Sequence, residues 1–329
     1  MRFGLFCTFD NPHDDFARAF AEQTSLVRLA EDLGFEEAWA VEHHFNAESP
    51  VPSCLMTLAY LAARTSRIRL GSAAVLLPFH NPMLIAEEAA TLDILSDGRF
   101  DFGVAKGGPF PMQNKHFCVD VAGSREKTFE ALALIQRLLA EDEVSFEGAH
   151  FRADRVRLAP KPLQRPIPTY IATSTPGITQ RAATLGYGFM SGPPFPLKIV
   201  ARNVAAYRDA APEADPKLVL MRFFHLAPTR AQAREEAATF LAPFIARMRE
   251  TTARMQPEWT EWFDVERVMD DSLIGAAEEI SDRLREIETE IGPRSVVLKP
   301  LSPLLSKRSA DLAVFSEAIR PMAAQAAAS

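Results

Sequence analysis

The sequence predicts an α/β fold, and within that class a closed (β/α)8 barrel, or TIM barrel. Segments with the apolar pattern of buried strands alternate with amphipathic helical segments along the whole chain. Eight such strands can be assigned, and no linker or change of composition divides the 329 residues. We therefore expect a single domain over residues 1–329, in which residues 310–329 form a helical or frayed tail.

The first half of the sequence contains four strand–helix units. Gly34 ends the first helix, and Asn81 as N-cap with Pro82 at the first helical position begins the third. Residues 106–123 are expected to form a loop that leads into a helix from Ser124. The four strands are expected at residues 2–8, 38–41, 68–77 and 100–105.

The second half repeats this order with insertions. A small hairpin over 144–151, turning at Glu147-Gly148, is expected before the fifth strand. A helix should follow the seventh strand over about 231–255. No Gly-x-Gly-x-x-Gly motif follows any strand, so a dinucleotide-binding doubly wound sheet is disfavoured. The remaining strands are expected at 167–172, 188–191, 218–226 and 295–299.

Composition excludes several classes of function. The net charge is −7 and basic residues are scattered, so the chain has no basic stripe for nucleic acid. Cys7, Cys54 and Cys118 are widely spaced and predict neither disulfides nor a zinc site, which fits a reducing cytoplasm. No segment has the length or apolar character of a membrane span or a signal peptide, so we expect no membrane partner.

Residues just beyond the carboxyl ends of barrel strands meet at one face, where barrel enzymes place their chemistry. Small residues in the third strand leave room there for a flat ligand. A lysine, with hydroxyls at a helix N-terminus, favours an anion, so the sequence predicts a phosphorylated cofactor. The residues at this face are Glu42, His43 and His44; Ser72, Ala73 and Ala74; Lys106; and Thr173, Ser174 and Thr175.

These residues lie in motifs that resemble those of the bacterial luciferase-like, flavin-dependent monooxygenases over nearly the whole chain. The Glu42-His43-His44-Phe45 motif is similar to that of the FMN-using branch of this family. Other matching motifs are Leu70-Gly71-Ser72-Ala73-Ala74-Val75-Leu76-Leu77-Pro78, His80-Asn81-Pro82, Asp97-Gly98-Arg99-Phe100 and Gly103-Val104-Ala105-Lys106-Gly107.

The resemblance implies a role for each of these positions. His43 matches a catalytic imidazole that handles protons near the flavin, with Glu42 and His44 as its orienting neighbours. Ala73-Ala74 matches a non-prolyl cis peptide beside the isoalloxazine, and Ala105 stands where a relative has a reactive cysteine. Lys106 and Arg125 match phosphate-binding cations, and the phosphate cradle would be completed by Thr173, Ser174 and Gly177.

The implied activity is that of an FMN-dependent monooxygenase. Reduced FMN, supplied by a separate flavin reductase, would react with O2 to give a flavin C4a-peroxide that oxygenates a small, apolar organic substrate. Residues 256–272 would form a lid over the site, or equally a connection packed on the barrel rim. The resemblance also implies a homodimer through the helix over 81–95. The expected substrate-pocket residues are Phe6, Phe45, Phe110 and Phe224.

Three alternatives stay open from the sequence. One is a hydride-transferring oxidoreductase that uses a deazaflavin, although such relatives show Asp-His after the second strand. Another is a non-catalytic flavin-binding subunit. The third is a metal-dependent hydrolase, but the adjacency of His43 and His44 does not suit metal ligation, so we expect no metal.

Overall fold

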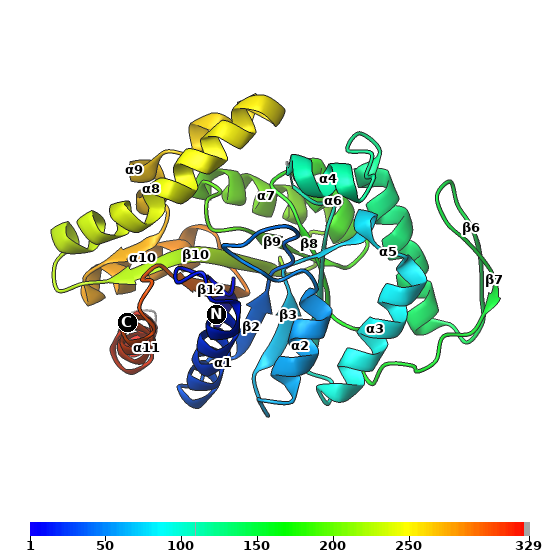
Figure 1. The fold of residues 1–329 in the computed structure, drawn as a ribbon, viewed down its shortest axis with the longest axis horizontal. Helices are drawn as coiled ribbons and strands as arrows, with labels where there is room; N and C mark the ends of the chain where they lie inside the picture. Colours follow the sequence, from blue (N-terminus) through cyan, green and yellow to red (C-terminus); the bar gives the residue numbers. More distant parts are fainter. Residues whose placement is uncertain (109, 326–329) are drawn as a thin grey trace.

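The computed structural model describes residues 1–108 and 110–325. Ten strands form one sheet, in which two short strands are additions and the other eight, all parallel, make the barrel. The barrel closes because β1 pairs with both β2 and β12, while β9 pairs with β10. This architecture confirms the predicted TIM barrel (Figure 1). The eight strands are β1 (Arg2–Cys7), β2 (Glu37–Ala40), β3 (Arg69–Ser72), β5 (Phe100–Ala105), β8 (Thr169–Ala172), β9 (Gly188–Ser191), β10 (Leu218–Leu226) and β12 (Ser295–Pro300).

The third barrel strand is shorter than predicted: it ends at Ser72, and a cis peptide bond joins the next two residues, Ala73 and Ala74. Leu70 pairs with Phe100 and Val75 pairs with Val104. Between these two pairs the chain advances five residues on the β3–β4 side but only four on β5, so the β3–β4 side has one extra residue. The chain then continues as β4 (Val75–Leu76) and a 3-10 turn, η1 (Leu77–Phe79). The other short strand, β11 (Leu273–Gly275), pairs with the end of β10.

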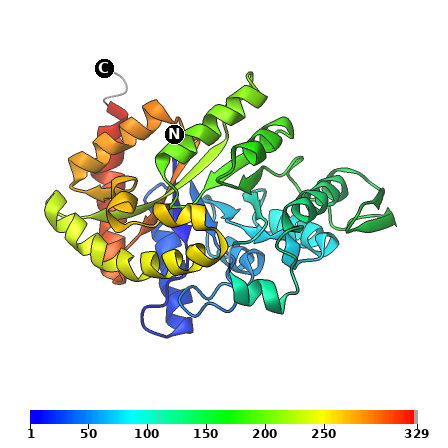
Figure 2. The same cartoon turned by 90° about the horizontal axis from the view of Figure 1, so that it is seen from above.

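Helices surround the barrel, as the view from above shows (Figure 2). Several begin at a side-chain cap, since Asp15, Ser53 and Asn81 each accept a hydrogen bond from a backbone N–H of the first turn. The helices are α1 (Phe16–Asp32), α2 (Cys54–Ala62), α3 (Pro82–Leu95), α5 (Ser124–Ala140), α6 (Pro176–Thr184), α7 (Leu197–Ala210), α8 (Arg230–Met255) and α10 (Ala277–Glu290). At the C-terminal end come α11 (Leu305–Val314), a π-helical turn η3 (Phe315–Ile319) and α12 (Arg320–Gln325).

The barrel interior is filled at its middle and at the N-terminal ends of its strands. Trp39 occupies the middle, where a Cβ added at Gly71 would lie 2.1 Å from the indole ring. Below it, the indole N–H donates to the Glu37 carboxylate at 2.9 Å. Arg294 lies 3.1 Å from this carboxylate, and Asp101 is buried and paired with an arginine of β3. Because side chains fill these levels, a ligand site belongs at the other end, above the indole.

Two insertions differ from their predicted form. The segment expected as a loop contains a short helix, α4 (Pro111–His116). The hairpin consists of β6 (Val144–Glu147) and β7 (Arg152–Val156), so its second strand lies beyond the predicted end. The Glu130 carboxylate accepts hydrogen bonds from three successive N–H groups over 149–151, which holds those residues as the loop of the hairpin. The hairpin projects away from the barrel (Figure 1).

The segment over 256–272 folds as η2 (Pro257–Trp262) and α9 (Val265–Asp270). Trp262 and Phe263 are buried, and Phe263 belongs to an apolar cluster with Phe223 of β10 and residues of α8. Trp259 and Trp262 stack, and both contact Phe195 edge-on in the loop after β9. In this structure the segment is therefore packed on the rim of the barrel.

Within the described residues, the helices lack the combination of length and apolar character that crossing a bilayer requires.

Candidate active site

Small apolar residues form a floor above the filled part of the barrel. Ala73, Ala105, Ala172 and Phe6 are partly buried and pack on the inner cluster that contains Trp39. The cis peptide that the resemblance implied is present between Ala73 and Ala74. The structure thus brings together Ala73, Ala74 and Ala105, three of the predicted cofactor-binding residues.

Close contact between β3 and β5 positions the residues of this floor that lie at the ends of these strands. Ser72 Oγ donates to the Gly103 carbonyl and accepts from the Gly103 N–H, both at 2.8 Å. A Cβ added at Gly103 would lie 1.9 Å from the Ser72 carbonyl oxygen. Only glycine permits this approach, which holds the end of β3, next to Ala73, against β5.

His43 is partly buried where the chain leaves β2. Its Nδ1 lies 2.8 Å from Ser49 Oγ, and its backbone N–H donates to the Val51 carbonyl. Burial lowers the pKa of His43 to about 4, although the nearby carboxylates of Asp10 and Glu42 act in the opposite direction. The imidazole is therefore neutral near pH 7. Its Nε2 has no hydrogen-bond partner among the described side chains, so this atom is available to a ligand.

Neither Glu42 nor His44, the expected orienting neighbours, hydrogen-bonds the His43 side chain. The buried Glu42 carboxylate accepts hydrogen bonds instead from His44 Nε2 at 3.3 Å and from His80 Nε2 at 2.8 Å. Burial opposes ionisation, but these two hydrogen bonds lower the pKa of Glu42 to about 2. The three side chains also bring possible ligand atoms within 4.8 Å of one another, a spacing that a cation could use. In the structure, hydrogen bonding already engages these atoms.

An aromatic cluster covers the outer side of His44. Its ring centroid lies 4.6 Å from that of Phe117 and 5.8 Å from that of Phe79. Phe45 packs on Phe117 from outside and is 66% exposed, so it belongs to the outer surface of this cluster. His44 is thus held between a carboxylate and aromatic rings.

Two predicted cofactor cations lie near each other, and one of them, Lys106, directly follows Ala105 of the floor. Burial lowers the pKa of Lys106, and the positive charge of Arg125 lowers it further. No acidic side chain of the described residues pairs with either cation. Arg125 lies in the first turn of α5, where the adjacent Glu126 pairs with Arg181 of α6 at 3.1 Å. That ion pair ties the beginning of α5 to α6.

The predicted hydroxyl-bearing turn precedes α6. The Thr175 N–H donates to Thr173 Oγ1 at 3.0 Å, and the Thr173 N–H donates to a carbonyl of β9. Thr173 and Ser174 are partly buried, and a Cβ added at Gly177 would meet nothing within 4 Å. The first turn of α6 is therefore open to a ligand.

The predicted substrate-pocket residues do not form one group. Phe224 was wrongly predicted: it is fully buried on the outer face of β10, where its ring lies 5.6 Å from Phe315 of the C-terminal helices. Phe110 is 38% exposed at the beginning of α4, and Phe45 lies outside as described. Phe6 alone of the four lies on the floor.

Four residues near His43 and Glu42 were not predicted. Ser49 is the hydrogen-bond partner of His43, and His80 is a hydrogen-bond partner of Glu42. Asp10 forms an ion pair with Lys299 of β12 and accepts a hydrogen bond from Thr8. Burial alone would raise the pKa of Asp10, but Lys299 lowers it, so the carboxylate is charged. His80 lies in a matching motif, whereas the other three have no local signal in the sequence.

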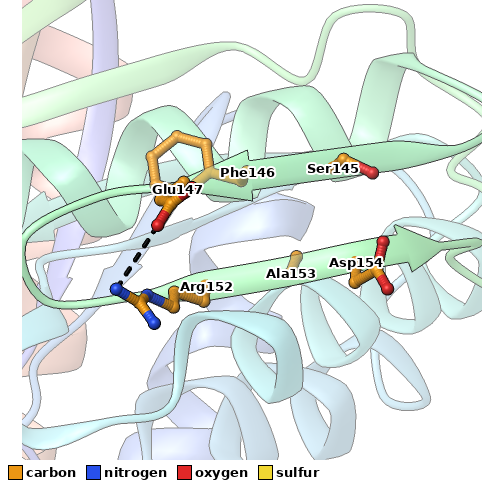
Figure 3. A pocket seen from close by; sticks show the side chains of 6 residues that line it. All are labelled: Ser145, Phe146, Glu147, Arg152, Ala153 and Asp154. Atoms are coloured by element: carbon orange, nitrogen blue, oxygen red, sulfur yellow. Dashed lines mark ion pairs between the residues drawn. The ribbon is translucent and has the colours of Figure 1, made fainter.

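A hollow on the projecting hairpin is a less suitable site (Figure 3). It is open and is lined by Ser145, Phe146, Ala153, Asp154 and the exposed Glu147–Arg152 ion pair, whose atoms lie 3.3 Å apart. Glu147 and Arg152 are paired with each other, and none of the lining residues is part of the face at the strand ends.

Comparisons with known proteins agree with this geometry. The crystal structure of the monooxygenase RslO1 from Streptomyces bottropensis superimposes with a TM-score of 0.84 at 28% identity, over 98% of this chain and 99% of that one. The oxygenase component of the flavin-dependent trigonelline monooxygenase of Acinetobacter baylyi is 25% identical over 310 residues, covering 88% of this chain and 86% of the relative. The F420-dependent glucose-6-phosphate dehydrogenase of Kineococcus radiotolerans is 32% identical over 193 residues, covering 53% and 54%.

The chain matches about half the length of several curated relatives. The model of the family described as luciferase-like monooxygenase matches residues 1–295, which is most of the chain. The protein therefore belongs to the luciferase-like monooxygenase family of oxidoreductases.

Proposed function

We propose that this protein is an FMN-dependent monooxygenase that receives reduced FMN from a separate flavin reductase and uses O2 to oxygenate a small, apolar organic substrate. The observation that carries this proposal is the pair of cations, Lys106 and Arg125. They lie near each other beside the alanine floor, without an acidic partner among the described residues. A phosphate group would relieve their repulsion.

The shapes and charges of the site fit FMN. Lys106, Arg125 and the open first turn of α6 would bind the phosphate. The small side chains of Ala73, Ala105 and Ala172 on the floor would leave room for the flat isoalloxazine. The aromatic rings around Phe117 offer an apolar wall for the substrate.

Bound reduced FMN would supply the electrons that activate O2, so that one oxygen atom passes to the substrate and the other leaves as water. The protein's part is to bind, orient and handle protons. His43, neutral and with Nε2 available, would accept a hydrogen bond or a proton from a reacting oxygen. Glu42 and His44 would support the loop that carries His43, through the hydrogen bonds to His80 and the aromatic cluster.

Hydride transfer with the deazaflavin F420 is the second candidate, because an F420-dependent dehydrogenase is among the relatives. The oxygenase component of a two-component system among the relatives supports the reductase partner. The Glu42-His43-His44 motif favours FMN over F420.

An anaerobic titration that compares reduced FMN, reduced riboflavin and reduced F420 tests the proposal. Wild-type protein should bind reduced FMN at least tenfold more tightly than riboflavin, since a charge-assisted hydrogen bond contributes about 1.5–3 kcal/mol. Lys106→Ala should lose most of that preference for the phosphate, whereas Lys115→Ala, at an exposed position of α4, should retain it. Preferential binding of F420, or equal binding of FMN and riboflavin by the wild type, would contradict the proposal.

We also propose a homodimer through α2 and α3. Four large apolar side chains are 42–75% exposed on these neighbouring helices: Met56, Tyr60, Leu84 and Leu95. Sedimentation at micromolar concentration should give twice the mass of the 36.4 kDa chain. Leu84→Glu should shift this mass toward the monomer, and a monomeric wild type would refute the dimer.

A further inference from the structure

We propose that Ser49 is a positioning residue that fixes the tautomer of His43, with the ring hydrogen on Nδ1 and the lone pair on Nε2. The catalytic role of Ser49 rests on the function proposed above. Its effect on the tautomer of His43 does not.

The direction of each hydrogen bond follows from what each atom is able to donate. Ser49 Oγ lies 2.5 Å from the Thr8 carbonyl oxygen and 2.8 Å from His43 Nδ1. A carbonyl oxygen accepts only, so the single hydroxyl hydrogen of Ser49 points to Thr8. Ser49 Oγ must then accept from His43, which requires the hydrogen on Nδ1. The neutral ring is left with its lone pair on Nε2.

The loop that carries Ser49 is held independently of its hydroxyl group. The side-chain oxygen of Asn46 accepts from the N–H groups of Glu48 and Ser49, at 3.0 and 3.2 Å. Asn11 then bonds the loop twice, donating to the carbonyls of Ala47 and Glu48. Removing the Ser49 hydroxyl should therefore change the hydrogen bonding of His43 without releasing the loop.

The charged groups around His43 do not fix its tautomer by themselves. Asp10 and Glu42 favour a protonated ring, while Lys299 and His44 oppose it. Asp10 is linked to the same strand end, because Thr8 Oγ1 donates to it at 2.8 Å. None of these four groups hydrogen-bonds His43, so the contact with Ser49 decides which nitrogen carries the hydrogen.

Loss of this contact has a defined consequence. A neutral imidazole without a partner favours the hydrogen on Nε2, which is the opposite of the arrangement that Ser49 selects. In Ser49→Ala, His43 Nε2 would donate instead of accept. A reacting oxygen that must give up a proton at this site would then face the Nε2–H of His43, which donates and cannot accept the proton.

Two-bond 15N–1H spectra of histidine-labelled protein at pH 7, without flavin, test the tautomer directly. His43→Gln identifies the His43 signals, and Ser49→Thr is the matched variant that keeps a hydroxyl group. Wild type and Ser49→Thr should show Nδ1 as the hydrogen-bearing nitrogen of His43. Ser49→Ala should show Nε2 in that role, or an average of both. If the wild type carries the hydrogen on Nε2, or Ser49→Ala leaves the pattern unchanged, the proposal is overturned.

Turnover measures the catalytic consequence. With a substrate found by screening, kcat of Ser49→Ala should fall at least about tenfold, within the range that general acid–base groups contribute. The affinity for reduced FMN should be unchanged, and Ser49→Thr should restore most of kcat. An unchanged kcat together with a changed tautomer would overturn the positioning role. Failure of the wild type to bind reduced FMN would overturn the proposed function, while the spectra still decide on Ser49.

Discussion

The ionised Glu42 carboxylate should stabilise the fold, by an amount that follows from its pKa. Hydrogen bonds from His44 and His80 outweigh the effect of burial and lower this pKa from 4.5 to about 2. At about 1.4 kcal/mol for each pH unit, the difference corresponds to about 3 kcal/mol of unfolding free energy. A lowered pKa stabilises the folded state fully above pH 4.5, and this contribution is lost as the pH falls toward 2.

Glu42→Gln removes the charge and nearly preserves the shape, so urea unfolding of this variant measures the contribution. Although burial opposes it, the hydrogen bond to Glu42 raises the pKa of His80. The wild type should therefore exceed the variant by about 3 kcal/mol near pH 5–6, where Glu42 and His80 both carry charge. The difference between wild type and variant should shrink as the pH falls from about 4.5 toward 2, and it should also narrow above about pH 7.

Glu87→Gln is the control. Because Glu87 is exposed on α3, this substitution should change the unfolding free energy little at any pH. A difference below about 1 kcal/mol near pH 5–6, or one that does not change on acidification, would refute the assignment of Glu42 as an ionised, hydrogen-bonded carboxylate.

Three more variants or treatments probe other features. Phe224→Ala should reduce the unfolding free energy by about 3–5 kcal/mol with little effect on flavin affinity, because Phe224 packs outside the barrel; Phe45→Ala should be nearly neutral for stability. A selective loss of flavin binding in Phe224→Ala would contradict this placement. Gly103→Ala should destabilise the protein and weaken reduced FMN binding, since its Cβ would lie 1.9 Å from the Ser72 carbonyl, whereas Gly177→Ala should unfold like the wild type. Equal stability of the two glycine variants would argue against the close contact. Dialysis against EDTA should leave turnover unchanged, because Glu42 already satisfies His44 and His80, and activity restored by added zinc would show that a metal is required.

The strands could be predicted because each is a short apolar run between polar segments. The orientation of their side chains was harder to predict. All nine residues of β10 are buried, so no alternation of polar and apolar residues marks which of them face inward. The sequence therefore does not reveal that Phe224 faces the helices rather than a substrate pocket. The prediction of a cis peptide at Ala73-Ala74 rested on the family resemblance and not on the pattern of residues.

The cations and small residues of the site could be predicted because they follow strand ends. Their partners could not, because these lie far away in the sequence. His80 is 38 residues from Glu42, and Ser49 reaches the Thr8 carbonyl across 41 residues. Neither contact leaves a local pattern, and a local pattern is what reading a single sequence detects.

The ion pair between Asp10 and Lys299 spans 289 residues and joins the ends of β1 and β12, the two strands that meet when the barrel closes. Contacts of such long sequence separation form late in folding, because they require closure of a very large loop. During synthesis, Asp10 therefore lacks its ion-pair partner until β12 has left the ribosome. A polypeptide truncated before β12 would carry every predicted flavin ligand, yet would lack the strand that completes the wall beside His43. Flavin binding by this protein should therefore report on completed folding.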